Sequence, residues 1–130
     1  MATLRLVKSD AEIDCLVRSA AMTAEGLERA IESVEPGISD NHIAAAGAQA
    51  MLEAGSEFFS LAPIVTTGLR SGTIHVNHQR HPVHQGDVVF LEFGAVWRRY
   101  TAPIMRTVVI GSVTDEMQHA AELCAVMESE

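Results

Sequence analysis

The 130-residue sequence predicts a single α+β domain, in which helices flank a curved antiparallel sheet. Two features of the sequence predict this class. Apolar residues recur at helical spacing in the first part of the chain and again near its end, and short runs rich in β-branched residues lie between them. The expected order of elements is helix, helix, strand, loop, three strands and helix. Because the sequence has no internal repeat, low-complexity tract or linker, residues 1–130 are expected to form one unit.

The first helix is expected to begin after Ser9, which forms an S-x-x-E capping box with Glu12. Apolar residues then alternate at spacings of three and four as far as Val34, which is the period of one helix face. Charged residues fall largely outside this face, so the helix is expected to be amphipathic. Pro36-Gly37 is a strong stop signal and is expected to end it.

Similar signals predict a second helix and a last helix. Ser39 or Asp40 should cap the second helix, whose Ala and Gly residues would let it approach a sheet closely, and Gly55 is its expected stop. Thr114 is expected to cap the last helix. No Gly or Pro stop signal follows in that helix before Glu130, so we expect the natural chain to continue.

The stretch from Gly86 to Gly111 is expected to form three short antiparallel strands. Val88–Leu91 is an apolar run too short for a stable helix, and β-branched residues recur over Thr107–Ile110. Gly94 permits a tight bend or a bulge between these runs. Pro103 has no N–H for the ladder and should lie at an edge or a bulge.

Glu92 is an acid inside this apolar unit, between Leu91 and Phe93. A carboxylate in such surroundings is costly unless something pairs with it. We therefore take Glu92 as the first candidate for a functional residue.

A polar loop from Leu69 to Gln85, expected to contain one short strand, follows a predicted strand at Pro63–Thr67. Its histidines are spaced by three: His75, His78, His81 and His84. Pro82 argues against a helix that would gather them, and no Cys or carboxylate among them completes a known metal spacing, so no metal centre is expected here. The last three are expected to be exposed. His75 has apolar neighbours, where a histidine is either a hydrogen-bonded core residue or a proton-transfer group.

Composition and charge limit the partners. Nine basic and seventeen acidic residues give a net charge of −8, which would repel the backbone of a nucleic acid. The sequence has no apolar run long enough to span a membrane and no signal-peptide core, so neither a membrane nor a nucleic acid is an expected partner. Cys15 and Cys124 fall in helical patterns and are expected to be small core residues, which favours a reducing, cytoplasmic setting.

Four stretches carry a resemblance to a known family: EIDCLVRSAAMTAEGL in the first helix, VEPGISDNHIAA after it, PIVTTGLRSGTIH before the histidines, and GDVVFLEFGAVWRRYTAPIMRT in the sheet. They resemble the first half of the catalytic domain in the pita-bread family, which includes creatinase, prolidase, aminopeptidase P and methionine aminopeptidase. The resemblance implies half of a pita-bread fold, and it implies an enzyme of the hydrolase class.

In the metal-dependent members of that family, two aspartates from this sheet are ligands of a dinuclear metal centre. Glu92 and Pro103 stand at the equivalent positions here. Because proline has no side-chain donor, the chain resembles the metal-free branch, which implies neither a metal nor another cofactor. The pattern E-x-G-x(5)-Y-x-x-P-x-x-R-T is similar to that of the ectoine hydrolases, which belong to that branch together with creatinase.

The resemblance to the metal-free branch implies hydrolysis of a C–N bond in a small amidine, guanidine or cyclic amino-acid derivative. His75 would carry proton transfer, and Glu92 would either hold a cationic group of the substrate or attack it. Two alternatives stay open. The chain could belong to a metal-dependent Xaa-Pro dipeptidase or aminopeptidase with a peptide-like substrate, or it could be a non-catalytic interaction module of the same fold.

The pita-bread fold is built from two similar halves with the active site between them, and this sequence resembles the N-terminal half. One half alone would leave an apolar face of its sheet uncovered. We therefore expect a homodimer, in which an identical chain takes the place of the absent half, and little activity from the chain by itself.

Overall fold

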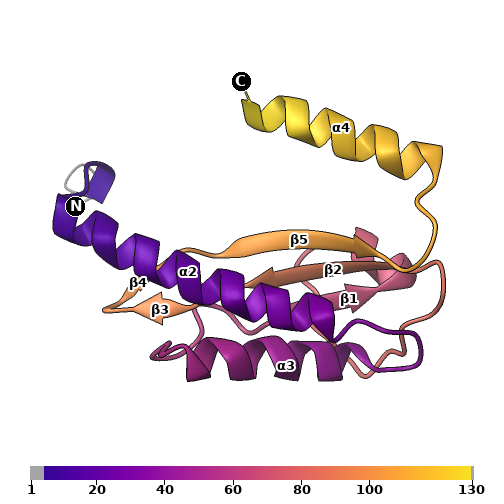
Figure 1. Ribbon diagram of the computed structural model, residues 1–130, viewed down its shortest axis with the longest axis horizontal. Coiled ribbons are helices and arrows are strands. Elements are labelled where there is room, and N and C mark those ends of the chain that lie inside the picture. Colours follow the sequence, from indigo (N-terminus) through magenta and orange to yellow (C-terminus); the bar gives the residue numbers. More distant parts are fainter. Residues whose placement is uncertain (1–4, 130) are drawn as a thin grey trace.

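The computed structural model describes residues 5–129 and confirms the α+β class. A three-stranded antiparallel sheet lies beside two helices, and a further helix follows it (Figure 1). Among the described residues, no helix combines the length and the apolar composition that crossing a bilayer would need. The elements in chain order are α2 (Asp10–Glu32), α3 (Asp40–Glu53), β1 (Ile64–Thr67), the 3-10 helix η1 (Gly68–Gly72), β2 (Val88–Phe93), β3 (Val96–Trp97), β4 (Tyr100–Thr101), β5 (Ile104–Val109) and α4 (Asp115–Ser129).

The main sheet has the strand order β1-β2-β5, so β2 is its central strand. Both pairings are antiparallel, and the register aligns Glu92 of β2 with Ile64 on β1 and with Met105 on β5. Strands β3 and β4 form a separate two-stranded hairpin. The unit between Gly86 and Gly111, predicted as three strands, therefore contains four.

A tight turn at Arg98 and Arg99 accounts for the extra strand. Both residues have positive φ, 51° and 70°, as the two central residues of the tightest hairpin turns do. Such turns usually contain Asn, Asp or Gly, because other side chains disfavour positive φ, so the sequence gives no turn signal here. Glu57 stabilises the turn: its Oε1 accepts a hydrogen bond from the Arg98 N–H at 3.0 Å, and its Oε2 lies 3.7 Å from Nη1 of Arg99.

Helix α2 begins at the predicted capping box. The backbone N–H and the hydroxyl of Ser9 both donate to Oε2 of Glu12 at 2.8 Å. The helix ends at Glu32, earlier than the predicted stop at Pro36-Gly37. Ser33 explains the difference, because its hydroxyl donates to the carbonyl three residues earlier at 2.7 Å and competes with continuation of the helix.

The alternating side chains of β2 divide the sheet into two faces. Val89, Leu91 and Phe93 belong to the buried core with α2 and α3, and we call this side the helix face. Gly47 lets α3 approach it, since a Cβ there would lie 2.5 Å from the ring of Phe93. The close approach predicted for the second helix is thus confirmed. The opposite side, called the Glu92 face, carries the half-buried residues of β2 and their cross-strand partners: Val88, Phe90, Glu92, Ile64, Thr66, Met105, Thr107 and Val109.

Two hydroxyl groups of α2 hold the base of the β3–β4 hairpin. Ser19 Oγ donates to the carbonyl oxygen of Ala95 at 2.8 Å and accepts from the Ala102 N–H at 3.0 Å. Thr23 Oγ1 accepts from the Ala95 N–H at 2.9 Å. Ser19 and Thr23 are fully buried, so these polar groups are paired as burial requires. Because Ala95 and Ala102 flank the hairpin, α2 fixes its position.

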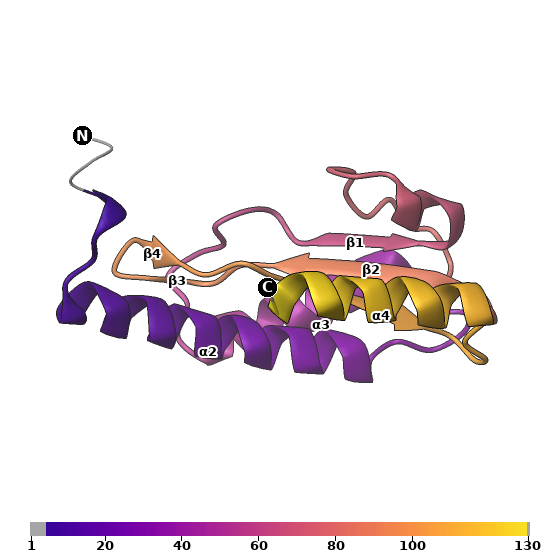
Figure 2. The ribbon, with the colours of Figure 1, turned by 90° about the horizontal axis from the view of Figure 1, so that it is seen from above.

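The predicted loop from Leu69 to Gln85 begins with η1 and contains no strand, which corrects the expectation of one. Within the part of the chain that the structure describes, an isolated bridge from Pro82 to Ser39 is its one strand-like pairing. Other N–H groups of the loop donate hydrogen bonds to side chains, as described below for Asp40. Figure 2 shows η1 on the side of β1 away from α2, and the loop that follows η1 returns to the start of α3.

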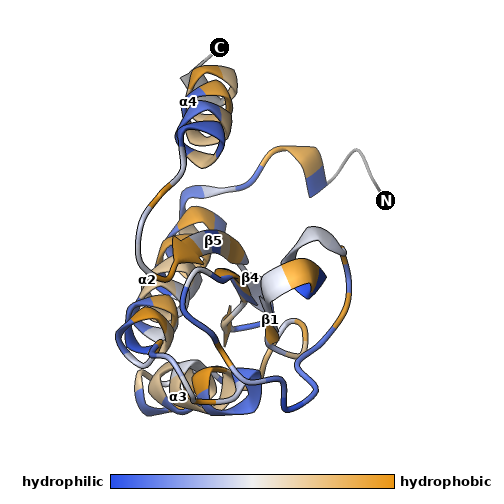
Figure 3. Ribbon diagram, turned by 90° about the vertical axis from the view of Figure 1, so that its right-hand side faces the viewer, coloured by the Kyte–Doolittle hydropathy of each residue, from blue (hydrophilic) through white to orange (hydrophobic). Residues whose placement is uncertain are grey.

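Helix α4 stands away from the rest of the fold (Figures 1 and 3). Its predicted cap is confirmed, because Thr114 Oγ1 accepts from the Met117 N–H at 3.2 Å. Cys124 on α4 is exposed and Cys15 on α2 is half-buried, so the prediction that both are core residues is wrong. Cys124 is exposed because α4 contributes no residue to the core cluster.

Candidate active site

Glu92 lies near the C-terminal end of the central strand β2, and its side chain belongs to the face turned away from α2 and α3. Its cross-strand partners Ile64 and Met105 share that face, as antiparallel partners do. Its chain neighbours Leu91 and Phe93 point to the helix face, so Glu92 is half-buried rather than enclosed in the core. No described residue donates a hydrogen bond to its carboxylate or forms an ion pair with it, so the carboxylate is available to a ligand.

His75 lies on the loop that follows η1. Its φ of 57° is uncommon for a residue other than glycine, and its side chain is exposed. The neighbouring Ile74 is 81% exposed, so the apolar patch predicted around His75 does not form. Among the described residues, no hydrogen bond or cavity contains both His75 and Glu92. Their convergence in one cleft stays a prediction.

The other loop histidines differ in their surroundings. His78 is half-buried and its Nδ1 lies 3.0 Å from the carbonyl oxygen of Pro63, so the prediction that His78 is exposed is wrong. Because Pro63 directly precedes β1, this contact ties the loop to the edge of the sheet. His81 and His84 are exposed as predicted, and Nδ1 of His84 lies 3.4 Å from Oδ2 of Asp87.

Asp40, the first residue of α3, anchors the loop that carries these histidines. Its carboxylate accepts hydrogen bonds from the N–H groups of Gln79 and His81, both at 3.0 Å, and from Nη1 of Arg70 at 3.3 Å. Nη2 of Arg70 donates to the carbonyl oxygen of Asn77 at 2.7 Å. The sequence indicates Asp40 only as a candidate helix cap, because its partners lie 30 to 41 residues away.

The residues around Glu92 do not fit a dinuclear metal centre. Such a centre needs several converging oxygen or nitrogen donors, whereas Ile64 and Met105 flank Glu92. Pro103, which the family resemblance aligns with a second ligand, is exposed between β4 and β5 and offers no side-chain donor. Within the described part of the chain, no three His, Cys, Asp or Glu side chains lie together as a metal ion would require.

Thr66 adds an unpaired polar group to the Glu92 face. It is the cross-strand partner of Phe90 and is fully buried. Its Oγ1 has no hydrogen-bond partner among the described residues. A buried hydroxyl in this state costs about 1–3 kcal/mol. The Glu92 face therefore contains polar groups that have no partner in the described part of the chain.

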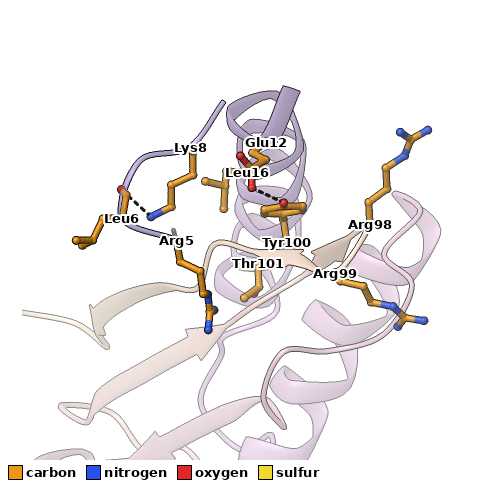
Figure 4. Close-up of a pocket in the computed structure, with 9 residues that line it drawn as sticks. All are labelled: Arg5, Leu6, Lys8, Glu12, Leu16, Arg98, Arg99, Tyr100 and Thr101. Carbon is orange, nitrogen blue, oxygen red and sulfur yellow. Dashed lines mark hydrogen bonds between the residues drawn. The ribbon is translucent and has the colours of Figure 1, made fainter. Parts of the chain in front are cut away.

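A cavity of about 770 Å³ opens between the start of α2 and β4 (Figure 4). Neither His75 nor Glu92 lines it. Its lining includes the cations Arg5, Lys8, Arg98 and Arg99. In Figure 4, Arg98 and Arg99 extend away from Glu12, so the cations do not converge on one point as an anion site would require. The cavity is therefore separate from the candidate site.

Glu12 and Tyr100 join α2 to the hairpin beside this cavity. The Tyr100 hydroxyl donates to Oε1 of Glu12 at 2.7 Å. Hydrogen bonds from the Ser9 backbone N–H and from the Tyr100 and Ser9 hydroxyls lower the pKa of Glu12 to about 2. The bond to Glu12, followed by burial, raises the pKa of Tyr100. Both shifts favour a charged carboxylate facing a neutral phenol, which is a structural contact rather than an acid–base pair.

The sequence matches the model of metallopeptidase family M24 over residues 14–128. This chain belongs to that family. The solved structure of prolidase from Pyrococcus furiosus matches this M24 chain with a TM-score of 0.86 at 26% sequence identity, over 90% of this chain and 35% of the prolidase. The predicted family and the pita-bread half-fold are both confirmed, and the family is one of hydrolytic peptidases, in line with the predicted enzyme class.

Curated relatives with different names resemble this M24 chain to similar degrees. The uncharacterized peptidase YqhT of Bacillus subtilis is 33% identical over 88% of this chain and 33% of its own length. A Xaa-Pro dipeptidase of Pyrococcus horikoshii is 27% identical over 92% of this chain and 34% of its own length. The ectoine hydrolase of Halomonas elongata is 26% identical over 89% of this chain and 31% of its own length. The chain thus spans about a third of the length of these relatives.

Proposed function

We propose that this chain carries part of the catalytic site of a metal-independent hydrolase, which breaks a C–N bond in a small amidine, guanidine or cyclic amino-acid derivative. The observation that carries the proposal is the set of donors around Glu92. A carboxylate lies between Ile64 and Met105, and Pro103 stands in place of a second acid. This arrangement offers one negative charge to a cation but offers a pair of metal ions too few ligands.

In this proposal Glu92 holds the cationic group of the substrate. An amidinium or guanidinium presents parallel N–H groups, which a carboxylate accepts as a bidentate pair. Half-burial of Glu92 supports the assignment, because water screens a charge pair less in such a place than at the surface. No described residue competes for the two oxygens.

His75 moves the protons of the proposed reaction. Its imidazole takes a proton from the attacking water and returns it to the departing nitrogen, so that a C–O bond forms and the C–N bond breaks without a net change of charge. The positive φ and the exposure of His75 support this role, since nothing about its packing explains such a backbone. The remaining groups of the site are assigned to the two thirds of the relatives' length that this chain does not cover.

A metal-dependent Xaa-Pro peptidase is the second candidate function. The named relatives favour it, because a Xaa-Pro dipeptidase is among them at 27% identity. The ectoine hydrolase, at 26% identity, supports the first candidate almost equally, so the degree of similarity does not decide between them. A peptidase of this kind would have to take nearly all of its metal ligands from outside this chain.

Turnover by the natural protein at its full length separates the two functions. After removal of metal with EDTA, we expect hydrolysis of at least one compound in a panel of amidines, guanidines and cyclic amidines, and no cleavage of Xaa-Pro dipeptides. Glu92→Gln should lower kcat/KM about 100-fold or more, because the amide loses the charge and one acceptor. Glu35→Gln, at an exposed acid after α2, is the matched control. Cleavage of Xaa-Pro dipeptides that stops with EDTA and returns with Mn²⁺ would establish the peptidase instead.

We also propose that the chain by itself forms a homodimer through the Glu92 face. Met105 is 54% exposed on that face, and α2 and α3 cover only the opposite face (Figure 3). A two-fold pair of these faces would bury Met105 and cover the half-buried Val88, Phe90 and Val109 further. Light scattering at micromolar concentration should give the dimer mass, and Met105→Glu should give the monomer. A compact monomer of the unchanged chain would contradict the proposal.

A further inference from the structure

The segment that contains His75 is closed by one guanidinium group rather than by backbone pairing. Nη1 of Arg70 donates to Oδ2 of Asp40 at 3.3 Å, and Nη2 of Arg70 donates to the carbonyl oxygen of Asn77 at 2.7 Å. Arg70 and Asn77 lie on either side of His75 in the chain. The two ends of the segment are therefore held together, and both are held to the first residue of α3.

The carboxylate of Asp40 binds this loop. Asp40 is fully buried, and its carboxylate accepts from Arg70 and from the N–H groups of Gln79 and His81, each of the latter at 3.0 Å. Its own N–H donates to the carbonyl oxygen of His81 at 2.9 Å. An acid in the first turn of a helix usually faces the N–H groups of its own helix. In the described part of the chain, no hydrogen bond joins the Asp40 carboxylate to those groups.

Asn41, the next residue of α3, binds the same loop. Asn41 Oδ1 accepts from the Arg80 N–H at 2.7 Å, so three successive N–H groups, of Gln79, Arg80 and His81, are bound by the side chains of Asp40 and Asn41. Hydrogen bonds to charged groups are shorter and stronger than neutral ones, and a carboxylate with several partners has a narrow choice of geometries. The arrangement fixes where the loop lies relative to α3 and the sheet.

We propose that Asp40 and Arg70 form a positioning pair, which holds the loop so that His75 is placed for the reaction at Glu92. The pair acts through the loop and does not touch the substrate. This inference rests on the proposed function, in which His75 transfers protons. If Asp40 and Arg70 served only the stability of the fold, variants of the pair that still fold would keep the kcat/KM of the unchanged protein.

Amide hydrogen exchange of the 130-residue chain tests whether the pair holds the loop. Arg70→Met is the first variant, because the Arg70 side chain is 24% exposed and its loss should leave the core intact. We expect the amides of Gln79 and His81 to exchange about tenfold faster or more, while the amide of Leu91 in the core is unchanged. Asp40→Asn should have a larger effect at the same amides. Unchanged exchange at Gln79 and His81 in Arg70→Met would overturn the inference.

Asp87→Asn is the matched control for these measurements. Asp87 also binds a loop N–H through its side chain, since its Oδ2 accepts from His84 at 2.8 Å, but it does not contact Arg70 or Asp40. Its replacement should leave the exchange of Gln79 and His81 unchanged. Acceleration of those amides by Asp87→Asn as well would show a general loosening of the loop and would count against a specific pair.

Kinetics of the natural full-length protein test whether the pair serves His75. We expect Arg70→Met to lower kcat about tenfold with KM changed less than about twofold, because placement of the proton carrier is lost while Glu92 still binds the substrate. Arg70→Lys keeps the charge opposite Asp40 but not the second bond to Asn77, so it should recover part of kcat. Unchanged kcat in Arg70→Met, in a protein that His75→Phe inactivates, would overturn the inference and leave the proposed function standing. Full turnover by His75→Phe itself would overturn both.

Discussion

The two faces of the central sheet differ in whether the polar groups beside them have hydrogen-bond partners. On the helix face, the hydroxyls of Ser19 and Thr23 are fully buried and each is hydrogen-bonded to the base of the hairpin. On the other face, Thr66 is buried with an unpaired hydroxyl, and Glu92 has no partner among the described residues. Unsatisfied groups that persist in a fold are expected where function, not stability, selects the residue. If the proposed function holds, residues for stability and residues for chemistry lie on opposite sides of one strand, β2.

The largest expected effect is the loss of a large side chain from the helix face. Phe93→Ala should lower the free energy of unfolding by about 3–5 kcal/mol, because Phe93 is fully buried against Gly47 of α3. Phe90→Ala, on the half-buried Glu92 face of the same strand, should cost about 1–2 kcal/mol. Urea denaturation of the two variants measures the difference. Equal losses would show that the two faces contribute equally and would break the comparison.

A smaller loss is expected from an isosteric change of a paired hydroxyl on the helix face. Thr23→Val should lower the free energy of unfolding by about 1–3 kcal/mol, because the buried N–H of Ala95 would lose its acceptor. Thr107→Val, at an exposed position of β5, is the control and should change stability by less than about 0.5 kcal/mol. A negligible effect of Thr23→Val in thermal or urea unfolding would mean that water replaces the lost bond.

A Thr→Val substitution on the Glu92 face should change the free energy of unfolding in the opposite direction. Thr66→Val removes a buried hydroxyl that has no partner within residues 5–129, so stability should stay unchanged or rise by up to about 1 kcal/mol. Thr67→Val is the neighbouring control, because Thr67 is buried and its Oγ1 donates to the carbonyl oxygen of Pro82 at 3.4 Å. Thr67→Val should therefore destabilise the chain. If Thr66→Val destabilised it more than Thr67→Val, the hydroxyl of Thr66 would have a partner after all.

The smallest effect concerns the contact between α2 and the β3–β4 hairpin and depends on pH. The pKa of Glu12 is lowered from an ordinary value of 4.5 to about 2, so its bonds to Ser9 and Tyr100 stabilise the fold fully above pH 4.5. This contribution is lost as the pH falls from 4.5 towards 2. The difference in unfolding midpoint between the natural chain and Glu12→Gln should therefore shrink over that range. Glu25→Gln, on the exposed side of α2, should show no such trend.

The raised pKa of Tyr100 gives the matching test at high pH. A neutral phenol that is bound in the fold stabilises it below the ordinary pKa of tyrosine, 10.0, and the stabilisation is lost as the pH rises through the raised value. The difference in unfolding midpoint between the unchanged chain and Tyr100→Phe should shrink as the pH rises. A constant difference at both ends of the pH scale would mean that the Glu12–Tyr100 bond is absent in solution.

Local signals in the sequence were sufficient for most of the fold. The capping box of Ser9 and Glu12, the strand at Ile64–Thr67 and the cap at Thr114 depend on residues within a few positions of each other, and all are confirmed. The turn at Arg98 and Arg99 could not be predicted, because its positive φ values are stabilised by Glu57, 41 residues away from Arg98. Contacts over such distances leave no local pattern.

The candidate site was less predictable than the fold. Glu92 could be singled out because an acid is unusual in an apolar strand, and its half-burial agrees with that interpretation. The surroundings of His75 were predicted wrongly, since Ile74 turns to solvent although it is apolar. Asp40 could not be identified as the anchor of the loop, because an acid at the start of a helix is explained by capping alone. Only the folded chain brings it to Gln79 and His81.

The hydrogen bonds from Ser19 and Thr23 to the base of the hairpin limit how early the chain can fold while it is being synthesised. Ser19 and Thr23 bind residues that follow them by 72 to 83 positions, so α2 is synthesised well before its partners exist. At roughly 5–20 residues per second, this gap lasts about 4 to 16 s. During that time the apolar residues Met22 and Leu27, which are buried in the finished fold, have no sheet to pack against. The contact between α2 and the hairpin therefore forms only after Ala95 and Ala102 have been synthesised.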